Sequence, residues 1–184
     1  MSAADQSRPG IRTVQISDGA VRWCPHQGAT GDPGRRPVPP VAEPRQGGRA
    51  VRRRAPRLPA LRPNEPFDAV ISFDTVHDLP DSDAFLRAVH RLLAPGGHYL
   101  MTEPRASSNL GDNIGHPSAP LLYAVSTLHC LTVSLAEGSA GLGTAFGEQK
   151  AIALFTEAGF TGITVTPTPG DPMGGVFVAT KPAA

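Results

Sequence analysis

The chain has 184 residues and a formal net charge of +1, with 40% hydrophobic and 5% aromatic residues. These values fit a single globular domain and exclude a chain that is strongly basic or acidic as a whole. The charge is unevenly spread: residues 1–66 hold twelve arginines against five acidic residues, and residues 67–184 hold five basic against eleven acidic residues. Eleven of the twenty prolines also lie in residues 1–66, so we place a compositional boundary near Pro66.

Residues 1–65 give weak structural signals. A few scattered apolar residues are compatible with a hairpin whose turn is Asp18-Gly19. Beyond residue 24, repeated prolines forbid long helices and central strands, and there is too little apolar surface to offset the entropy of folding. We therefore expect residues 1–65 to be a disordered segment, either native or read out of its ancestral frame. The arginine run 49–57 has no interleaved aromatic residue, which disfavours a nucleic-acid-binding arm.

Residues 67–104 predict a strand, a helix and a second strand. Ala69-Val-Ile71 is a short apolar run that suits a strand buried on both faces. Asp81 or Ser82 can cap a helix whose apolar residues recur at helical spacing up to Leu93, and Pro95-Gly-Gly97 stops it. Tyr99-Leu-Met101 is the second strand. Such a crossover implies two parallel strands.

The remainder of the chain continues the α/β pattern. We expect an apolar helix after Pro120 and an amphipathic helix over 148–158, closed by Gly159 as a left-handed cap. Strands follow at 163–166 and 175–180. The first should run parallel to the earlier strands, and the last should be antiparallel and inserted beside it. The fold class is thus α/β with a mostly parallel sheet over residues 66–184, preceded by the segment 1–65.

The sequence gives only indirect indications of cellular location and of metal binding. Cys24 and Cys130 form no paired spacing, and no apolar leader follows Met1, so we expect a cytoplasmic protein. The most apolar window, 119–136, is interrupted by polar residues, which argues against a membrane span. No spacing of histidines, cysteines or acidic residues indicates a metal site.

An ordered set of motifs resembles the C-terminal half of class I S-adenosylmethionine-dependent methyltransferases, over about residues 66–181. The set comprises Phe67-Asp-Ala-Val-Ile71, Val76-His-Asp-Leu79, Leu93-Ala-Pro-Gly-Gly97, Glu103-Pro104, Tyr123, Ser126-Thr-Leu128, Cys130, Ser134-Leu135, Leu142-Gly-Thr144 and Glu157-Ala-Gly-Phe160. The resemblance implies a partial Rossmann-like sheet and methyl transfer from S-adenosylmethionine to a small-molecule acceptor.

The resemblance also implies which residues form the site, at the C-terminal ends of the parallel strands. Phe73, Asp74 and Thr75 would bind the methionine end of the cofactor, and His77 and Asp78 would be catalytic. Two of these residues have a structural alternative: Asp74 as a turn residue, and His77 as a histidine satisfied by nearby backbone.

A second group of residues would contact the acceptor. Glu103 would lie at the acceptor side, or would simply cap its loop or pair with Arg105. Tyr123, Thr127, Cys130 and Ser134 share one helical face, which is either a wall of the acceptor pocket or a helix-packing surface.

The glycine-rich turn and the acidic strand end that bind most of the cofactor in this family have no counterpart in residues 1–66. Without those elements, the strand at 69–73 would have an exposed edge. We therefore expect a truncated methyltransferase that is weakly active or inactive alone. The alternatives are a non-catalytic interaction module with a basic arm, or a non-functional frame-shifted product. The acceptor and the oligomeric state are left open.

Overall fold

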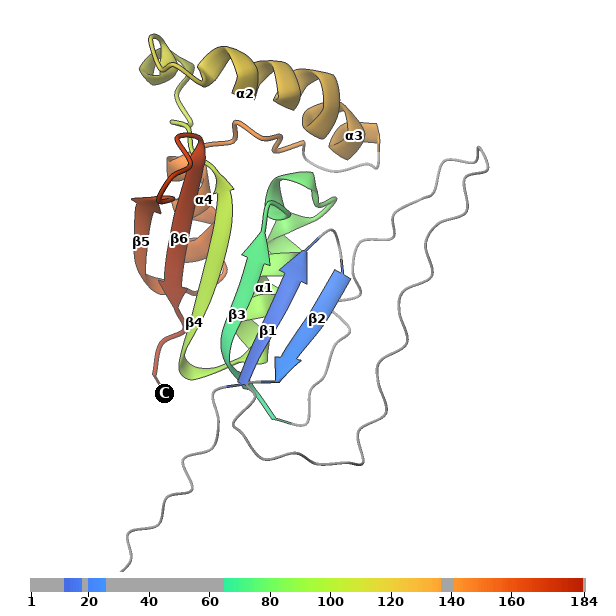
Figure 1. Ribbon diagram of the computed structural model, residues 1–184. Helices are drawn as coiled ribbons and strands as arrows, with labels where there is room; N and C mark the ends of the chain where they lie inside the picture. The colour runs from blue at the N-terminus through green and yellow to red at the C-terminus, as the bar shows by residue number, and fades with distance from the viewer. Residues whose placement is uncertain (1–11, 18–19, 26–64, 137–140, 184) are drawn as a thin grey trace, which may run out of the picture.

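The computed structural model describes residues 12–17, 20–25, 65–136 and 141–183, which form one six-stranded sheet with helices on one face and across one end of its strands (Figure 1). The strand order is β2-β1-β3-β4-β6-β5. The strands are β1 (Arg12–Ser17), β2 (Ala20–Pro25), β3 (Phe67–Phe73), β4 (Leu93–Pro104), β5 (Thr161–Pro167) and β6 (Gly174–Thr180).

Most strands of the sheet run in one direction. β1 pairs in parallel with β3, and β3 pairs in parallel with β4. β6 is antiparallel to both β4 and β5, so β5 has the direction of β4. The predicted α/β class, with a late antiparallel strand inserted into a parallel sheet, is confirmed.

The β3–α1–β4 unit has the order and the parallel strands that its sequence predicts, but Pro95-Gly-Gly97 lies within β4 and does not form the predicted turn after the helix. Asp81 is the N-cap of α1 (Ser82–Leu92), and its side chain accepts a hydrogen bond of 2.7 Å from the backbone N–H of Ala84. Such a cap satisfies one of the donors left free at a helix start. α1 ends at Leu92, and β4 begins directly at Leu93.

The β1–β2 hairpin departs from our expectation. Its two strands flank residues 18–19, where the turn was predicted, and β1 covers the edge of β3 that we expected to be exposed. Arg12 fixes β1 to the start of β3: its backbone N–H donates to Asp68 at 2.7 Å, and its guanidinium forms an ion pair of 3.0 Å with Glu65. The twelve residues of the hairpin therefore belong to the sheet. The arginine run 49–57 lies outside the described residues. The expected disorder of this part of the chain, and the boundary near Pro66, therefore stay predictions.

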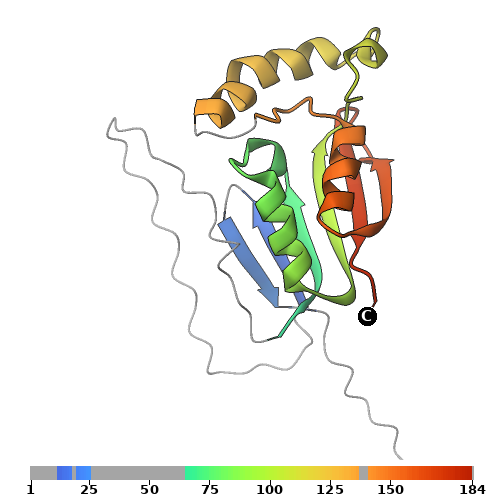
Figure 2. The same ribbon diagram turned by 180° about the vertical axis from the view of Figure 1, so that it is seen from behind.

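One face of the sheet carries the main core. Figure 2 shows α1 and α4 (Glu148–Glu157) on the same side of the sheet. There Tyr99, Phe155, Phe160 and Phe177 pack together, with ring centroids 5.5–6.4 Å apart in the contacts of Phe155. Gly159 (φ 95°) ends α4 in the left-handed conformation, as predicted.

A nearly continuous helical stretch crosses above the ends of the parallel strands (Figure 1). It follows η3 (Leu110–Asn113) and consists of α2 (Ala119–Val125), the π-helical turn η4 (Ser126–Cys130) and α3 (Leu131–Ala136). By length and composition alone, Ala119–Ala136 could cross a membrane, and 22% of it is buried. Here it packs over the strand ends through Leu122, Ser126, Cys130 and Ser134.

Candidate functional site

The candidate site begins where β3 ends. Ser17 of β1 and Thr102 of β4 both pair with Phe73, so the C-terminal ends of three parallel strands meet there. The next residue, Asp74, has a φ of 47°, and its backbone N–H donates to the carbonyl of Thr102 at 2.8 Å. A positive φ is uncommon outside glycine, although aspartate tolerates it better than most residues. The chain then tightens into the 3₁₀ turn η2 (Val76–Asp78).

Glu103, at the end of β4, holds this turn in place. Its Oε1 accepts hydrogen bonds from the backbone N–H groups of Thr75, at 2.9 Å, and Val76, at 2.6 Å. Its Oε2 lies 2.5 Å from Nδ1 of His77. Because Glu103 is only 2% exposed, these three donors supply the stabilisation that water would otherwise give to the carboxylate. Arg105 pairs with Glu148 instead, so the alternative pairing of Glu103 with Arg105 is wrong.

His77 is buried between carboxylates. Burial lowers its pKa, but the hydrogen bond and the charge of Glu103, together with the charges of Asp78 and Asp74, outweigh it and raise the pKa to about 10. Its Nε2 lies 3.4 Å from Oδ1 of Asp78. The partner that satisfies Nδ1 is therefore a carboxylate, not the backbone group of the structural alternative. The arrangement resembles the carboxylate–imidazole pairs that orient a histidine for proton transfer.

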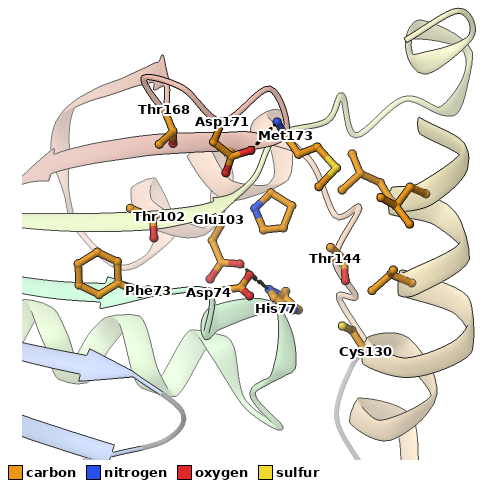
Figure 3. Close-up of a pocket in the computed structure, with 15 residues that line it drawn as sticks. Phe73, Asp74, His77, Thr102, Glu103, Cys130, Thr144, Thr168, Asp171 and Met173 are labelled. Atoms are coloured by element: carbon orange, nitrogen blue, oxygen red, sulfur yellow. Dashed lines mark hydrogen bonds and ion pairs between the residues drawn. The ribbon is translucent and has the colours of Figure 1, made fainter. Parts of the chain in front are cut away.

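A cavity of about 520 Å³ opens beside the His77–Glu103 pair (Figure 3). Its apolar wall comprises Phe73, Leu121, Leu122, Val125 and Met173. Its polar groups include Asp74, His77, Thr102, Glu103, Thr144, Thr168 and Asp171. The strand ends thus supply the charged groups, and α2 supplies much of the apolar surface.

The π turn η4 changes which helical residues face the sheet. We expected Tyr123, Thr127, Cys130 and Ser134 on one face, but the buried positions are Leu122, Ser126, Cys130 and Ser134. A π turn has hydrogen bonds to the fifth residue, so it contains more residues per turn than an α-helix and shifts the phase. Thr127 consequently lies on the exposed side, away from the cavity. Tyr123 faces a neighbouring cavity, where its hydroxyl accepts a 2.8 Å hydrogen bond from Asn113 Nδ2.

The other predicted site residues lie near the cavity with different degrees of access. Phe73, Asp74, His77, Glu103 and Cys130 line it. Thr75 is buried, and its hydroxyl donates to the carbonyl of Phe73 at 2.6 Å, so it shapes the turn from behind. Asp78 contacts His77 from the side of the turn.

Two overlapping groups of potential metal ligands also occur here. The ligand atoms of His77, Asp78 and Cys130 lie within 4.8 Å of one another, as do those of Asp74, His77 and Glu103. In the second group, Nδ1 of His77 and Oε2 of Glu103 already contact each other directly. The expectation of a site without metal stays a prediction.

Sequence reasoning missed Thr144, Thr168, Asp171 and Met173, which also line the cavity. Thr168, Asp171 and Met173 belong to the turn after β5. Because β5 is parallel to β4, the end of β5 opens at the same edge of the sheet as the end of β4, and this topology could have indicated them. Thr144 follows Gly143, where a Cβ would lie 2.4 Å from Oγ of Ser126. Glycine therefore allows this segment to pass close under the π turn.

The fold and this edge of the sheet define a Rossmann-like α/β protein with a pocket at the strand ends. A family described as "Methyltransferase domain" matches residues 20–165, and the chain belongs to that family. The suggested membership in the class I S-adenosylmethionine-dependent methyltransferases is confirmed. The match begins at residue 20, well before the region in which the resemblance was noticed.

The individual relatives are either distant in sequence or similar over only a short part of this chain. The chain is 28% identical over 127 residues to the hybrid PKS-NRPS synthetase ucsA of Acremonium sp, covering 64% of this chain and 3% of that protein. It is 44% identical over 43 residues to a fatty-acid O-methyltransferase of Mycolicibacterium smegmatis, covering 23% of this chain and 16% of that protein.

Solved structures resemble parts of the chain. A protein from Nostoc punctiforme, provisionally described as an O-methyltransferase, superposes with a TM-score of 0.50 and 21% identity, covering 67% of this chain and 34% of that chain. Human N-acetylserotonin methyltransferase gives a TM-score of 0.48 and 20% identity, and the match covers 67% of this chain and 32% of that chain. The chain thus spans about a third of these solved proteins and a smaller part of the curated relatives.

Proposed function

We propose that the protein transfers a methyl group from S-adenosylmethionine to an oxygen of a small-molecule acceptor. The observation that carries this proposal is the buried His77–Glu103 pair at the wall of the cavity, with 2.5 Å between Nδ1 and Oε2. Family membership supports the cofactor and the reaction class. The O-methyltransferase names of the M. smegmatis relative and of the Nostoc protein support oxygen as the acceptor atom.

The described residues fit the methionyl end of S-adenosylmethionine. Phe73 and Asp74 line the cavity, and the Asp74 side chain is 73% exposed, so its carboxylate is available to a cationic ligand. Thr75 supports the turn from behind. When bound, the cofactor would supply an electrophilic methyl group on a positively charged sulfur. The described residues provide fewer groups that could bind the nucleoside end of the cofactor. After β1 the chain continues into the antiparallel strand β2, whereas the family has a glycine-rich turn and a helix at this point.

In the proposed mechanism, His77 removes the proton of the acceptor hydroxyl. Glu103 accepts the Nδ1–H hydrogen bond, which leaves Nε2 as the basic atom. Asp78, 3.4 Å from Nε2, stabilises the imidazolium that forms. Glu103 is a positioning residue in this scheme, because both of its oxygens are already hydrogen-bonded. Leu121, Leu122 and Val125 would cover the apolar body of the acceptor and exclude water.

Substitution of His77 tests this proposal. The full-length protein would be incubated with radiolabelled S-adenosylmethionine and a panel of phenols and aliphatic alcohols. We expect His77→Gln to lower methyl transfer by about 10²–10⁴-fold, the usual contribution of a positioned general base. His116→Gln, at an exposed histidine, is the matched control. Equal activity of the two variants, or no methyl transfer to any panel member by the wild type, would contradict the proposal.

The remaining features of the protein are also proposals. We propose a cytoplasmic location, which is supported by the free thiol of Cys130. We propose that Cys130 contacts the acceptor, because it is a wall residue of the cavity. We further propose that methyl transfer by this chain alone is weak, because the described residues provide few groups for the nucleoside end of the cofactor.

A further inference from the structure

The end of the cavity opposite His77 is formed by the turn between β5 and β6. Figure 3 shows Asp171 and Met173 on this turn, with Glu103 and His77 on the other side of the cavity. Asp171 is exposed, and its Oδ1 accepts a 2.9 Å hydrogen bond from the backbone N–H of Met173. Within the described part of the chain, Asp171 has no ion pair with a lysine or arginine. Its carboxylate charge is therefore available to a ligand.

The charges around the cavity are unbalanced. Asp74, Glu103 and Asp171 line it, but no lysine or arginine does so among the described residues, and His77 is the single cationic side chain there. The charge of Glu103 is matched by its contact with His77. In the proposed function, Asp74 faces the cationic end of the cofactor. Asp171 is left without an assigned counter-charge.

Two hydroxyl groups in the wall also lack a partner. Thr144 is only 6% exposed, and its Oγ1 is buried with no hydrogen bond among the described residues. The Oγ1 of Thr168, on the same turn as Asp171, is likewise buried and unpaired. A buried polar group without a hydrogen bond has lost its contact with water uncompensated, so polar groups on a ligand would be favoured at this wall.

We propose that Asp171 selects acceptors that carry a positively charged ammonium group. In this arrangement the ammonium lies beside Asp171 and Thr168, and the apolar body of the acceptor packs along Leu121, Val125 and Met173. The acceptor hydroxyl then reaches His77 at the other side. The inference rests on the proposed function for the identity of the cavity as an acceptor site. It predicts that acceptors carrying a carboxylate in place of the ammonium are disfavoured, because Asp171 would repel them.

Three probes of nearly the same shape test the inference by charge alone. Tyramine is cationic, 4-ethylphenol is neutral and 4-hydroxyphenylacetate is anionic. Calorimetric titration of the full chain, with S-adenosylhomocysteine present, should rank them in that order, with tyramine about tenfold tighter than 4-ethylphenol, as one charge-assisted contact provides. Equal affinity for the three probes, tightest binding of the acid, or no binding of any probe would overturn the inference.

Asp171→Asn should abolish the preference for tyramine and leave the affinity for 4-ethylphenol unchanged. Asparagine keeps an oxygen for the N–H of Met173, so the turn should survive. Glu157→Gln, which removes an exposed carboxylate far from the cavity lining, is the matched charge control. A preference for tyramine that persists in Asp171→Asn would refute the role of this residue.

The wild-type probe series decides the inference even if Asp171→Asn fails to fold. Binding and methyl transfer are read separately. If the probes bind in the expected order of affinity but none is methylated, the proposed function is contradicted and the charge selection by Asp171 is supported.

Discussion

The carboxylate of Glu103 is bonded to three donors in the interior of the protein. Glu103→Ala would leave the N–H groups of Thr75 and Val76, and Nδ1 of His77, without their acceptor. Removing one partner of a buried ion pair typically costs about 3–5 kcal/mol. We therefore expect urea denaturation to show a loss of that order for Glu103→Ala.

The exposed pair of Arg105 and Glu148 provides the comparison. The Arg105 side chain is 45% exposed, so solvent screens the interaction. Glu148→Ala should lower the free energy of unfolding by at most about 1 kcal/mol. Similar losses for the two variants would mean that the burial of Glu103 has no energetic consequence.

The pKa of His77 gives the protein a defined dependence on alkaline pH. Because the folded-state pKa is raised from 6.5 to about 10, protonated His77 stabilises the fold fully below pH 6.5. That contribution is lost as the pH rises through about 10. Denaturation of the wild type between pH 6 and pH 10 should show this loss, and His77→Gln should not. A flat profile for the wild type would contradict it.

The same pKa predicts the pH dependence of catalysis. Below about pH 10 most of His77 is protonated, so the fraction that can accept a proton rises with pH. We expect kcat/KM for methyl transfer to rise by about tenfold per pH unit in the neutral range, as for a single required base. A rate that is constant between pH 7 and pH 9 would show that neutral His77 is not required.

His90 has the opposite dependence. Burial and the charge of Lys181 lower its pKa below 6.5, and the ring packs edge-on against Phe160, with centroids 5.1 Å apart. Neutral His90 therefore stabilises the fold above pH 6.5, and this contribution is lost as the pH falls through the lowered pKa. His90→Phe should reduce the loss of stability between pH 7 and pH 5. An unchanged acid profile in this variant would exclude His90 as the cause.

At the scale of elements, Gly147 controls how the loop before α4 meets the segment after β4. Its φ is 87°, and a Cβ there would lie 2.3 Å from the backbone nitrogen of Ser108. Its ψ of 163° adds to this, because positive φ with an extended ψ is essentially restricted to glycine. Gly147→Ala therefore combines a backbone strain of about 1–3 kcal/mol with an overpacking cost of about 1–3 kcal/mol.

Gly96 has a positive φ without the crowding. Its φ is 77°, but a Cβ at this position would have no atom within 4 Å. Gly96→Ala should therefore lower the melting temperature less than Gly147→Ala does. The reverse order would indicate that the Ser108 segment moves away freely.

Local patterns predicted the elements whose contacts are close in sequence. The apolar runs and the Asp81 cap predicted β3, α1 and β4 because a strand–helix–strand unit is encoded in one continuous stretch. The phase of the 119–136 helix was not predictable by counting, because a π turn depends on a change of hydrogen bonding that the spacing of apolar residues does not reveal.

The pairing of the hairpin with β3, and part of the cavity, were missed for a different reason. β1 is held by contacts of Arg12 with residues 65–68, more than fifty positions away, and composition alone carries no information on such pairing. Asp171 and Met173 lie on a turn whose place beside β4 follows from strand order, which local spacing does not give.

For the molecule as a whole, the hairpin should stay attached after the chain is cut. The arginines between residues 35 and 57 are potential trypsin sites. We expect limited digestion to cleave there, while the fragment with β1 and β2 co-purifies with the fragment that starts near Pro66, because β1 pairs along β3. Arg12→Ala removes the ion pair with Glu65 and should weaken this association. Separation of the two wild-type fragments without denaturant would contradict the pairing.

Cofactor affinity also belongs to the whole molecule. With few described groups for the nucleoside end, calorimetry on the full chain should give a dissociation constant for S-adenosylmethionine well above about 1 μM, weaker than about −8 kcal/mol. Low-micromolar binding would mean that the segment between β2 and β3 supplies the missing contacts.

The π turn at Ser126–Cys130 can be regarded as the trace of a one-residue insertion into an α-helix. The wider turn absorbs the extra residue, so Leu131–Ala136 keep the helical phase that they would have in an unbroken helix one residue shorter. Loss of one codon at this point would therefore change only the residues of the turn, among them Cys130 of the cavity wall, while the helix on either side and the sheet stayed in place. Such a change alters the wall of the cavity without any substitution at His77 or Glu103.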